Sequence, residues 1–151
     1  MEKAAITKGK IKAVSISKER GTRKYNVPTA ELKVNFGVTG DAHGGSQDRQ
    51  VSLLAAESID KMTAKGIKVA AGDFAENITT EGIDLQELSV GSKIRVGPEA
   101  EIEITQFGKR CHGACEILKL VGDCVMPREG LFAKVIKPGQ IKPGDEIEVL
   151  N

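Results

Sequence analysis

Two cysteines and a histidine lie close together beside two cations. Lys109 and Arg110 directly precede Cys111 in the segment Gln106-Phe-Gly-Lys-Arg-Cys-His-Gly-Ala-Cys115. The thiolate is the reactive form of cysteine, and neighbouring positive charge lowers the pKa of a thiol. The spacing therefore predicts sulfur or metal chemistry at Cys111.

The cysteines also permit a zinc site, because zinc takes four sulfur or nitrogen ligands in a tetrahedron. Three and then eight residues separate the cysteines, unlike the paired two-residue knuckles of zinc ribbons, and this spacing argues against zinc. Buried packing cysteines and a reversible disulfide between the first two are further alternatives. The four candidate zinc ligands are Cys111, His112, Cys115 and Cys124.

Two glycine-containing loops carry further polar residues. The first, Gly40-Asp-Ala-His-Gly-Gly45, is followed by Arg49, whose planar fork suits phosphate or carboxylate. The second, Gly72-Asp-Phe-Ala-Glu-Asn-Ile78, contains Asn77. Each loop by itself is equally consistent with a plain polar turn that satisfies local backbone groups.

Short strands must position these residues. Seven stretches are β-branched or alternate between apolar and polar residues, and Gly, Pro, Asn or Asp bound them. This spacing predicts a mainly β fold, a strand-rich β-barrel with a few short helices. The predicted strands are Ile11–Ser17, Leu32–Val38, Gln50–Leu54, Lys93–Val96, Glu101–Gln106, Leu131–Ile136 and Glu146–Leu150.

Two helices and one repeated sequence pattern complete the predicted elements. Ala55–Lys65 has helical spacing and ends at a glycine. A second helix over about His112–Leu120 would place Cys111 at its N-terminus, where the helix dipole favours a thiolate or a bound anion. Val90–Val96 and Pro143–Val149 both place a glycine turn before an Ile-x-Val strand, which predicts repeated barrel-entry geometry.

Composition excludes several classes of function. The 151 residues fit a single domain over 1–151. A net charge of +1 and 3% aromatic residues argue against nucleic acid binding. No long apolar stretch is present, so we expect a cytoplasmic protein without membrane contact. Three cysteines in that compartment favour free thiols.

Taken in order, the segments resemble the MOSC domain, the module at the C-terminus of molybdenum-cofactor sulfurases. The resemblance covers about residues 38–150 and implies a strand-rich barrel with one signature cysteine. The matching motifs are Gly40-Asp-x-His-x-Gly45, Arg49-x-Val-Ser-Leu53, Gly72-Asp-Phe-x-Glu-Asn-Ile-Thr-Thr-x-Gly82, Val90-Gly91, and Thr105-Gln106 followed five residues later by Cys111.

The resemblance also implies roles for individual residues. Cys111 matches the signature cysteine by its distance from Gln106, although the hydrophobic pattern after the cysteine would also fit Cys115. In the family this cysteine is associated with carrying sulfur as a persulfide or with ligating molybdenum, and other members bind molybdopterin. We expect Cys111 to be the catalytic residue and the ligand of any bound molybdenum. The expected cofactor-binding residues are Asp41, His43, Arg49, Asn77, Lys109, Arg110 and Arg128.

The chain departs from the family pattern at several points. Ala75 stands where the family usually has Gly, and Arg110 stands where Pro commonly precedes the cysteine. We expect this chain to have neither the pyridoxal-phosphate desulfurase domain of the full sulfurases nor the extra N-terminal barrel of the molybdenum reductases. No resident pyridoxal phosphate is therefore expected. We expect a separate cysteine desulfurase as sulfur donor and a molybdenum-cofactor protein as acceptor.

Two classes of function stay open at this stage. The first is a sulfur-carrier or transferase-like protein, or one that depends on a bound molybdenum cofactor. The second is a non-enzymatic barrel that binds an anion or a partner protein and has a structural zinc or a thiol redox site. Fold and family alone do not decide between them.

Overall fold

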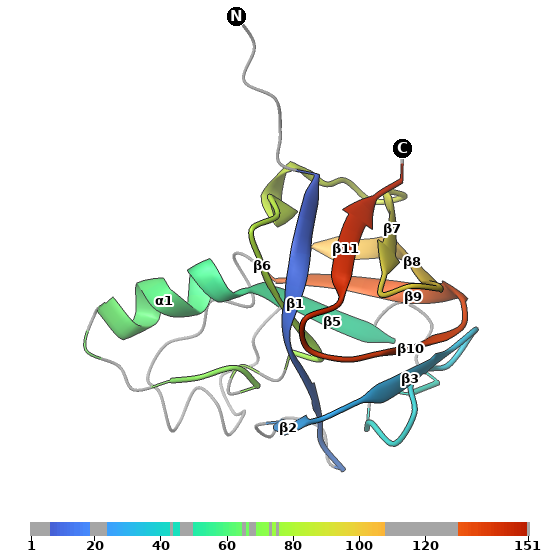
Figure 1. Ribbon diagram of the computed structural model, residues 1–151, viewed down its shortest axis with the longest axis horizontal. Helices are drawn as coiled ribbons and strands as arrows, with labels where there is room; N and C mark the ends of the chain where they lie inside the picture. The colour runs from blue at the N-terminus through green and yellow to red at the C-terminus, as the bar shows by residue number, and fades with distance from the viewer. Residues whose placement is uncertain are drawn as a thin grey trace, which may run out of the picture.

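A computed structural model describes residues 7–18, 24–42, 44–45, 50–64, 66, 69–72, 74, 76–107 and 130–150. Within these residues the chain forms one α-helix, α1 (Ala56–Ala64), one 3-10 helix, η1 (Leu85–Glu87), and eleven strands (Figure 1). The strands are β1 (Lys8–Ile16), β2 (Tyr25–Val27), β3 (Ala30–Lys33), β4 (Gly37–Val38), β5 (Val51–Ala55), β6 (Ile78–Glu81), β7 (Lys93–Val96), β8 (Ala100–Phe107), β9 (Leu131–Lys137), β10 (Gly139–Ile141) and β11 (Glu146–Val149).

Seven of these strands close a β-barrel. Their order is β1, β11, β7, β8, β9, β5 and β6, and β6 pairs again with β1. Neighbouring strands are antiparallel except β5 and β6, which run parallel with Leu53 opposite Ile78. A parallel pair needs a long crossover connection, and α1 forms part of it. The predicted mainly β barrel is confirmed.

The barrel core is aliphatic. Among the described residues, the buried cluster inside the barrel consists of Ile, Val, Leu and Ala, and the buried Phe74 and Phe132 lie outside this cluster. Alternate residues of each strand point inward, and branched aliphatic side chains fill a narrow barrel well. The absence of Trp from the sequence is consistent with such an interior. The core residues fully shielded from solvent include Val14, Val51, Ile78, Val96, Ile102, Ile104 and Ile147.

The repeated glycine pattern marks two strands that pair with each other. β7 and β11 are antiparallel, with Ile147 opposite Val96. Gly91 and Gly144, one before each strand, have φ angles of 96° and 94°, a region that favours glycine. The predicted strand-entry geometry is therefore confirmed. The predicted helix over Ala55–Lys65 is confirmed as α1.

The prediction of one strand over Leu32–Val38 was wrong. The segment is a tight hairpin, in which β3 and β4 pair with each other and β3 also pairs with β10. Asn35 and Gly37 adopt φ angles of 60° and 117°, so the backbone reverses between them. Leu32 and Val38 are opposite each other in the hairpin, and both side chains are buried. The alternation of apolar and polar residues therefore continues across the turn, although the strand does not.

The second predicted helix, His112–Leu120, lies outside the described residues. Within the part of the chain that is described, no helix has the length and apolarity needed to cross a membrane.

Candidate functional site

A buried polar network lies at the end of the barrel where β5 and β6 begin and β1 ends. The strand register places these three ends together, because Ile78 is opposite both Leu53 of β5 and Val14 of β1. Buried polar groups are costly unless they are hydrogen-bonded. The members of this network, all buried, are Ser15, Ser17, Lys24, Asp41, Ser52, Glu76 and Asn77.

Asn77 connects all three strand ends. Its Oδ1 accepts hydrogen bonds from Ser52 N (3.0 Å) and Ser52 Oγ (3.2 Å) at the start of β5. Its Nδ2 donates to Ser15 O at 3.0 Å, near the end of β1. The backbone N–H of Ser15 donates in turn to Asn77 O at 2.8 Å. The contacts show that Asn77 holds the entry of β6 against both neighbouring strands.

Glu76 closes the loop that leads into β6. Its carboxylate accepts hydrogen bonds from Gly72 N (3.0 Å), Phe74 N (3.2 Å) and Thr79 Oγ1 (2.9 Å). Burial raises the pKa of Glu76 above its ordinary value, while these hydrogen bonds act in the opposite direction. The carboxylate thereby organises the backbone of the Gly72–Asn77 loop around one buried group.

A buried ion pair holds the turn that follows β4 against the end of β1. Lys24 Nζ lies 2.7 Å from Asp41 Oδ1, and both side chains are fully buried. Lys24 Nζ also donates to Ser17 Oγ at 3.0 Å, and Ser17 N donates to the same Asp41 oxygen at 3.0 Å. The charge of Asp41 is thus compensated inside the protein.

Two of the predicted site residues, Asp41 and Asn77, fall within the described residues, and both belong to this network. Their role in cofactor binding stays a prediction, because the atoms described above engage partners within the protein. Outside the described residues lie His43, Arg49, Lys109, Arg110, Cys111 and Arg128, as well as the alternative zinc ligands His112, Cys115 and Cys124.

The described strands bound the segments that carry those residues. Asp41 precedes His43 by two positions, and Gln50 directly follows Arg49. The long segment with Cys111 and Arg128 leaves β8 after Phe107, which is paired with Leu131 at the start of β9. Among the described residues alone, no group of three or more His, Cys, Asp or Glu side chains is arranged to hold a metal ion.

Sequence inspection missed Lys24 and assigned no role to Glu76. Glu76 lies within a motif that matches the family, and this position could have indicated its role. No sequence signal indicates the role of Lys24, because its partner Asp41 is 17 residues away in the chain.

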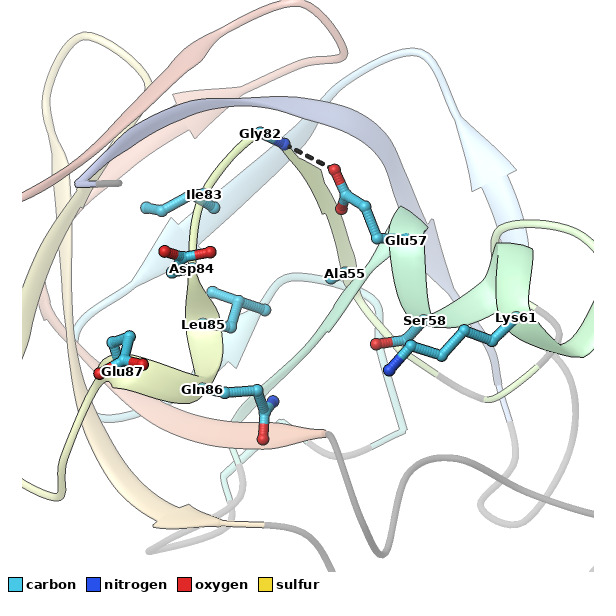
Figure 2. Close-up of a pocket in the computed structure, with 10 residues that line it drawn as sticks. All are labelled: Ala55, Glu57, Ser58, Lys61, Gly82, Ile83, Asp84, Leu85, Gln86 and Glu87. Atoms are coloured by element: carbon cyan, nitrogen blue, oxygen red, sulfur yellow. Dashed lines mark hydrogen bonds between the residues drawn. The ribbon is translucent and has the colours of Figure 1, made fainter. Parts of the chain in front are cut away.

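A separate groove of about 530 Å³ lies between α1 and η1 (Figure 2). Glu57 Oε2 accepts a hydrogen bond from Gly82 N at 3.0 Å across this groove. Ser58 and Lys61 project from the helix side, and Leu85 and Gln86 come from η1. Neither Asp41 nor Asn77, the two predicted site residues that the structure describes, lines the groove.

A profile of the MOSC domain matches residues 40–148. The chain belongs to the MOSC domain family. This family is broadly linked to molybdenum-cofactor sulfurase-like proteins. The match contains Asp41, Asn77 and Cys111, and the resemblance drawn from the sequence motifs is confirmed.

Solved structures share the fold of this MOSC domain. YuaD from Bacillus subtilis superposes with a TM-score of 0.79 at 20% identity, covering 94% of this chain and 95% of that one. YiiM from Geobacillus stearothermophilus gives a TM-score of 0.74 at 18% identity, covering 95% and 75%. YiiM from Escherichia coli gives a TM-score of 0.69 at 19% identity, covering 95% of this chain and 70% of that one. A search of curated proteins gave no significant match.

Proposed function

We propose that this MOSC domain carries sulfur on Cys111 as a persulfide and passes it to a metal cofactor. The observation that supports the proposal is the family match, whose range includes Cys111. In the motif resemblance drawn from the sequence, this cysteine stands five residues after Gln106. Lys109 and Arg110 precede the cysteine directly, and adjacent cations favour the thiolate that such a carrier needs.

The loading step is a thiolate exchange at sulfur. A persulfide on a cysteine desulfurase presents its outer sulfur to Cys111. The Cys111 thiolate attacks that sulfur, a new S–S bond forms at Cys111, and the S–S bond of the donor breaks. The donor cysteine leaves as a thiolate, so no external oxidant or reductant is needed. A molybdenum-cofactor protein would then be the acceptor. Release of the outer sulfur at the level of sulfide takes up two electrons, which a thiol reductant would supply as it forms a disulfide, and Cys111 would return to the thiolate.

A second version of the proposal has Cys111 as a ligand of molybdenum in bound molybdopterin. Soft sulfur ligands suit this chemistry. His43, Arg49 and Arg128 would bind the anionic phosphate of the cofactor together with Lys109 and Arg110, while Asp41 and Asn77 would orient its polar edges. These five cationic or imidazole side chains lie on segments outside the described residues.

The described part of the site fits an anionic ligand in one respect. A buried carboxylate near such a ligand would repel it, but Lys24 compensates the charge of Asp41 at 2.7 Å. Asn77 is neutral and holds three strand ends together. The Lys24–Asp41 pair thus adds no net charge next to the loop that leads to His43.

The test combines elemental and sulfur analysis. The wild-type chain is purified anaerobically from a host that makes the molybdenum cofactor, and molybdenum and zinc per chain are measured by elemental mass analysis. Sulfane sulfur is measured by cyanolysis after incubation with a cysteine desulfurase and cysteine. Cys111→Ser should lose the sulfane sulfur or the molybdenum. The matched variants Cys115→Ser and Cys124→Ser should retain it.

Three outcomes separate the alternatives. Sulfane sulfur without molybdenum supports the carrier, and near-stoichiometric molybdenum supports the cofactor-binding version. Full sulfane loading and molybdenum retention in Cys111→Ser would refute both. Stoichiometric zinc without sulfane sulfur or molybdenum would identify the protein as a binding module with a structural zinc.

A further inference from the structure

Lys24 contacts three loops at the polar end of the barrel. Its Nζ binds Asp41 Oδ1 at 2.7 Å and Ser17 Oγ at 3.0 Å. Its backbone N–H donates to Gly72 O at 2.8 Å. Lys24 thus joins the end of β1, the turn after β4 and the start of the Gly72–Asn77 loop.

Two further contacts connect the same loops. The backbone N–H of Ala42 donates to Ser17 O at 2.8 Å, which binds the turn after β4 to the end of β1 a second time. Gly72 N donates to the buried carboxylate of Glu76 at 3.0 Å. Gly72 itself has a φ of 94°, and a Cβ there would lie 2.4 Å from Lys24 O. The backbone of the loop is therefore fitted closely against that of Lys24.

A buried ion pair is a poor source of net stability, because desolvation of two charges offsets most of their attraction. Removing one partner, however, leaves the other charge buried without a compensating charge. The Lys24–Asp41 pair therefore allows one arrangement of these loops and makes others costly. Such a pair contributes more to geometry than to the free energy of unfolding.

We propose that Lys24 is a positioning residue: its side chain holds the turn after β4 against the end of β1, while its backbone N–H holds the start of the Gly72–Asn77 loop beside them. The inference rests on the proposed function only in its consequence for ligand binding, since these two loops carry Asp41 and Asn77 and lead directly to His43. Loss of the pair would uncouple the loops and weaken retention of the cofactor while the barrel stays folded.

The experiment compares Lys24→Met, Asp41→Asn and the double variant K24M/D41N in the full chain. Each single variant leaves one buried charge without its partner, whereas the double variant leaves none. Lys134→Met is the matched control, because Lys134 pairs with Glu103 at 3.7 Å and is 42% exposed. Three properties are measured: the urea midpoint, amide hydrogen exchange of residues 38–42 and 70–79, and molybdenum per chain from a cofactor-making host.

Lys24→Met should exchange roughly tenfold faster in the turn after β4, which the side chain binds, with β7 and β8 unchanged. The hydrogen bond from Lys24 N–H to Gly72 O does not depend on the side chain, so exchange of residues 70–79 should change less. The double variant should recover most of the urea midpoint but keep the fast exchange. Molybdenum is compared only among wild type, Lys24→Met and Lys134→Met, because Asp41 is itself a predicted cofactor-binding residue. Lys134→Met should match wild type in all three measurements. If a single variant does not fold, the double variant still tests the coupling.

Recovery of slow exchange together with the urea midpoint in the double variant would overturn the inference, since the pair would then only stabilise the fold. Unchanged exchange of residues 38–42 in Lys24→Met would also overturn it. If wild type retains no molybdenum, the cofactor-binding version of the proposed function fails, and hydrogen exchange alone decides the role of Lys24.

Discussion

Asn77 and Ser52 bind each other reciprocally at the start of two parallel strands. Asn77 N donates to Ser52 O at 3.0 Å, and Ser52 N donates to Asn77 Oδ1 at 3.0 Å. The side chain of Asn77 thus supplies an acceptor where the backbone ladder of β6 has not yet begun. The pairing of β5 with β6 is thereby extended to the loops that enter both strands.

We predict that Asn77→Ala costs about 3 kcal/mol of unfolding free energy, because it leaves Ser52 N and Ser15 O buried without this partner. Urea denaturation monitored by circular dichroism measures the change. Asn26→Ala is the matched control, since exposed Asn26 accepts one hydrogen bond from Ser15 Oγ at 2.7 Å. Its cost should be about 1 kcal/mol or less. Equal costs for the two variants would contradict the role given to Asn77.

Glu76 should make stability depend on pH. Its pKa is raised by burial, so the folded state holds the proton more tightly than the unfolded state does. The stability from this group is fully present below its ordinary pKa of 4.5 and is lost as the pH rises through the folded value. Urea unfolding across this range should show the decline in wild type and not in Glu76→Gln.

A second variant tests the same assignment. Thr79→Val removes a hydroxyl that stabilises the charged form of Glu76, so its pKa should rise further and the decline should extend to higher pH. Identical pH profiles for wild type and Glu76→Gln would show that another group causes the decline.

Gly37→Ala should destabilise the protein by about 2 kcal/mol or more. Gly37 has a φ of 117°, and a Cβ there would lie 2.4 Å from Gln50 O. Gly91→Ala is the matched control, because Gly91 has a φ of 96° and nothing within 4 Å of the added Cβ. Its cost should be about 1 kcal/mol, the penalty of the backbone conformation alone. A thermal melt of both variants separates steric conflict from backbone strain, and equal shifts would refute the steric argument.

Cys111 should react with iodoacetamide roughly tenfold faster than an ordinary cysteine at neutral pH. Cys124 in the same chain is the internal reference, and peptide mass spectrometry follows both residues. Replacing Lys109 and Arg110 by Gln should slow the reaction of Cys111, because the adjacent positive charge is removed. Slow alkylation of Cys111 in wild type would favour the binding-module alternative.

The sequence predicted some strands closely and missed others. β7 has its predicted bounds, whereas β1 begins three residues before its predicted start and β6 was not predicted as a strand. Alternation over β8 and β9 is a local signal, and both strands were predicted within two residues of their observed ends. β2 and β10 are three residues each, too short for alternation to be visible. The turn within Leu32–Val38 was missed because the apolar pattern continues across it.

The site was predicted only in part for a related reason. The motifs pointed to Asp41 and Asn77, but not to their partners Lys24, Ser52 and Ser15. Asn77 is 25 residues from Ser52 and 62 from Ser15. No local pattern encodes contacts over such separations, since they exist only when the strand register is set.

The sequence by itself determined the mainly β fold and the family and pointed to Cys111 for the proposed chemistry, because alternation, glycine turns and motif spacing are properties of neighbouring residues. Only the tertiary structure decided that β1 pairs with both β6 and β11 to close the barrel, and that Lys24 compensates Asp41. Both are contacts between distant segments, and their free energy is gained only once the chain has closed around its core.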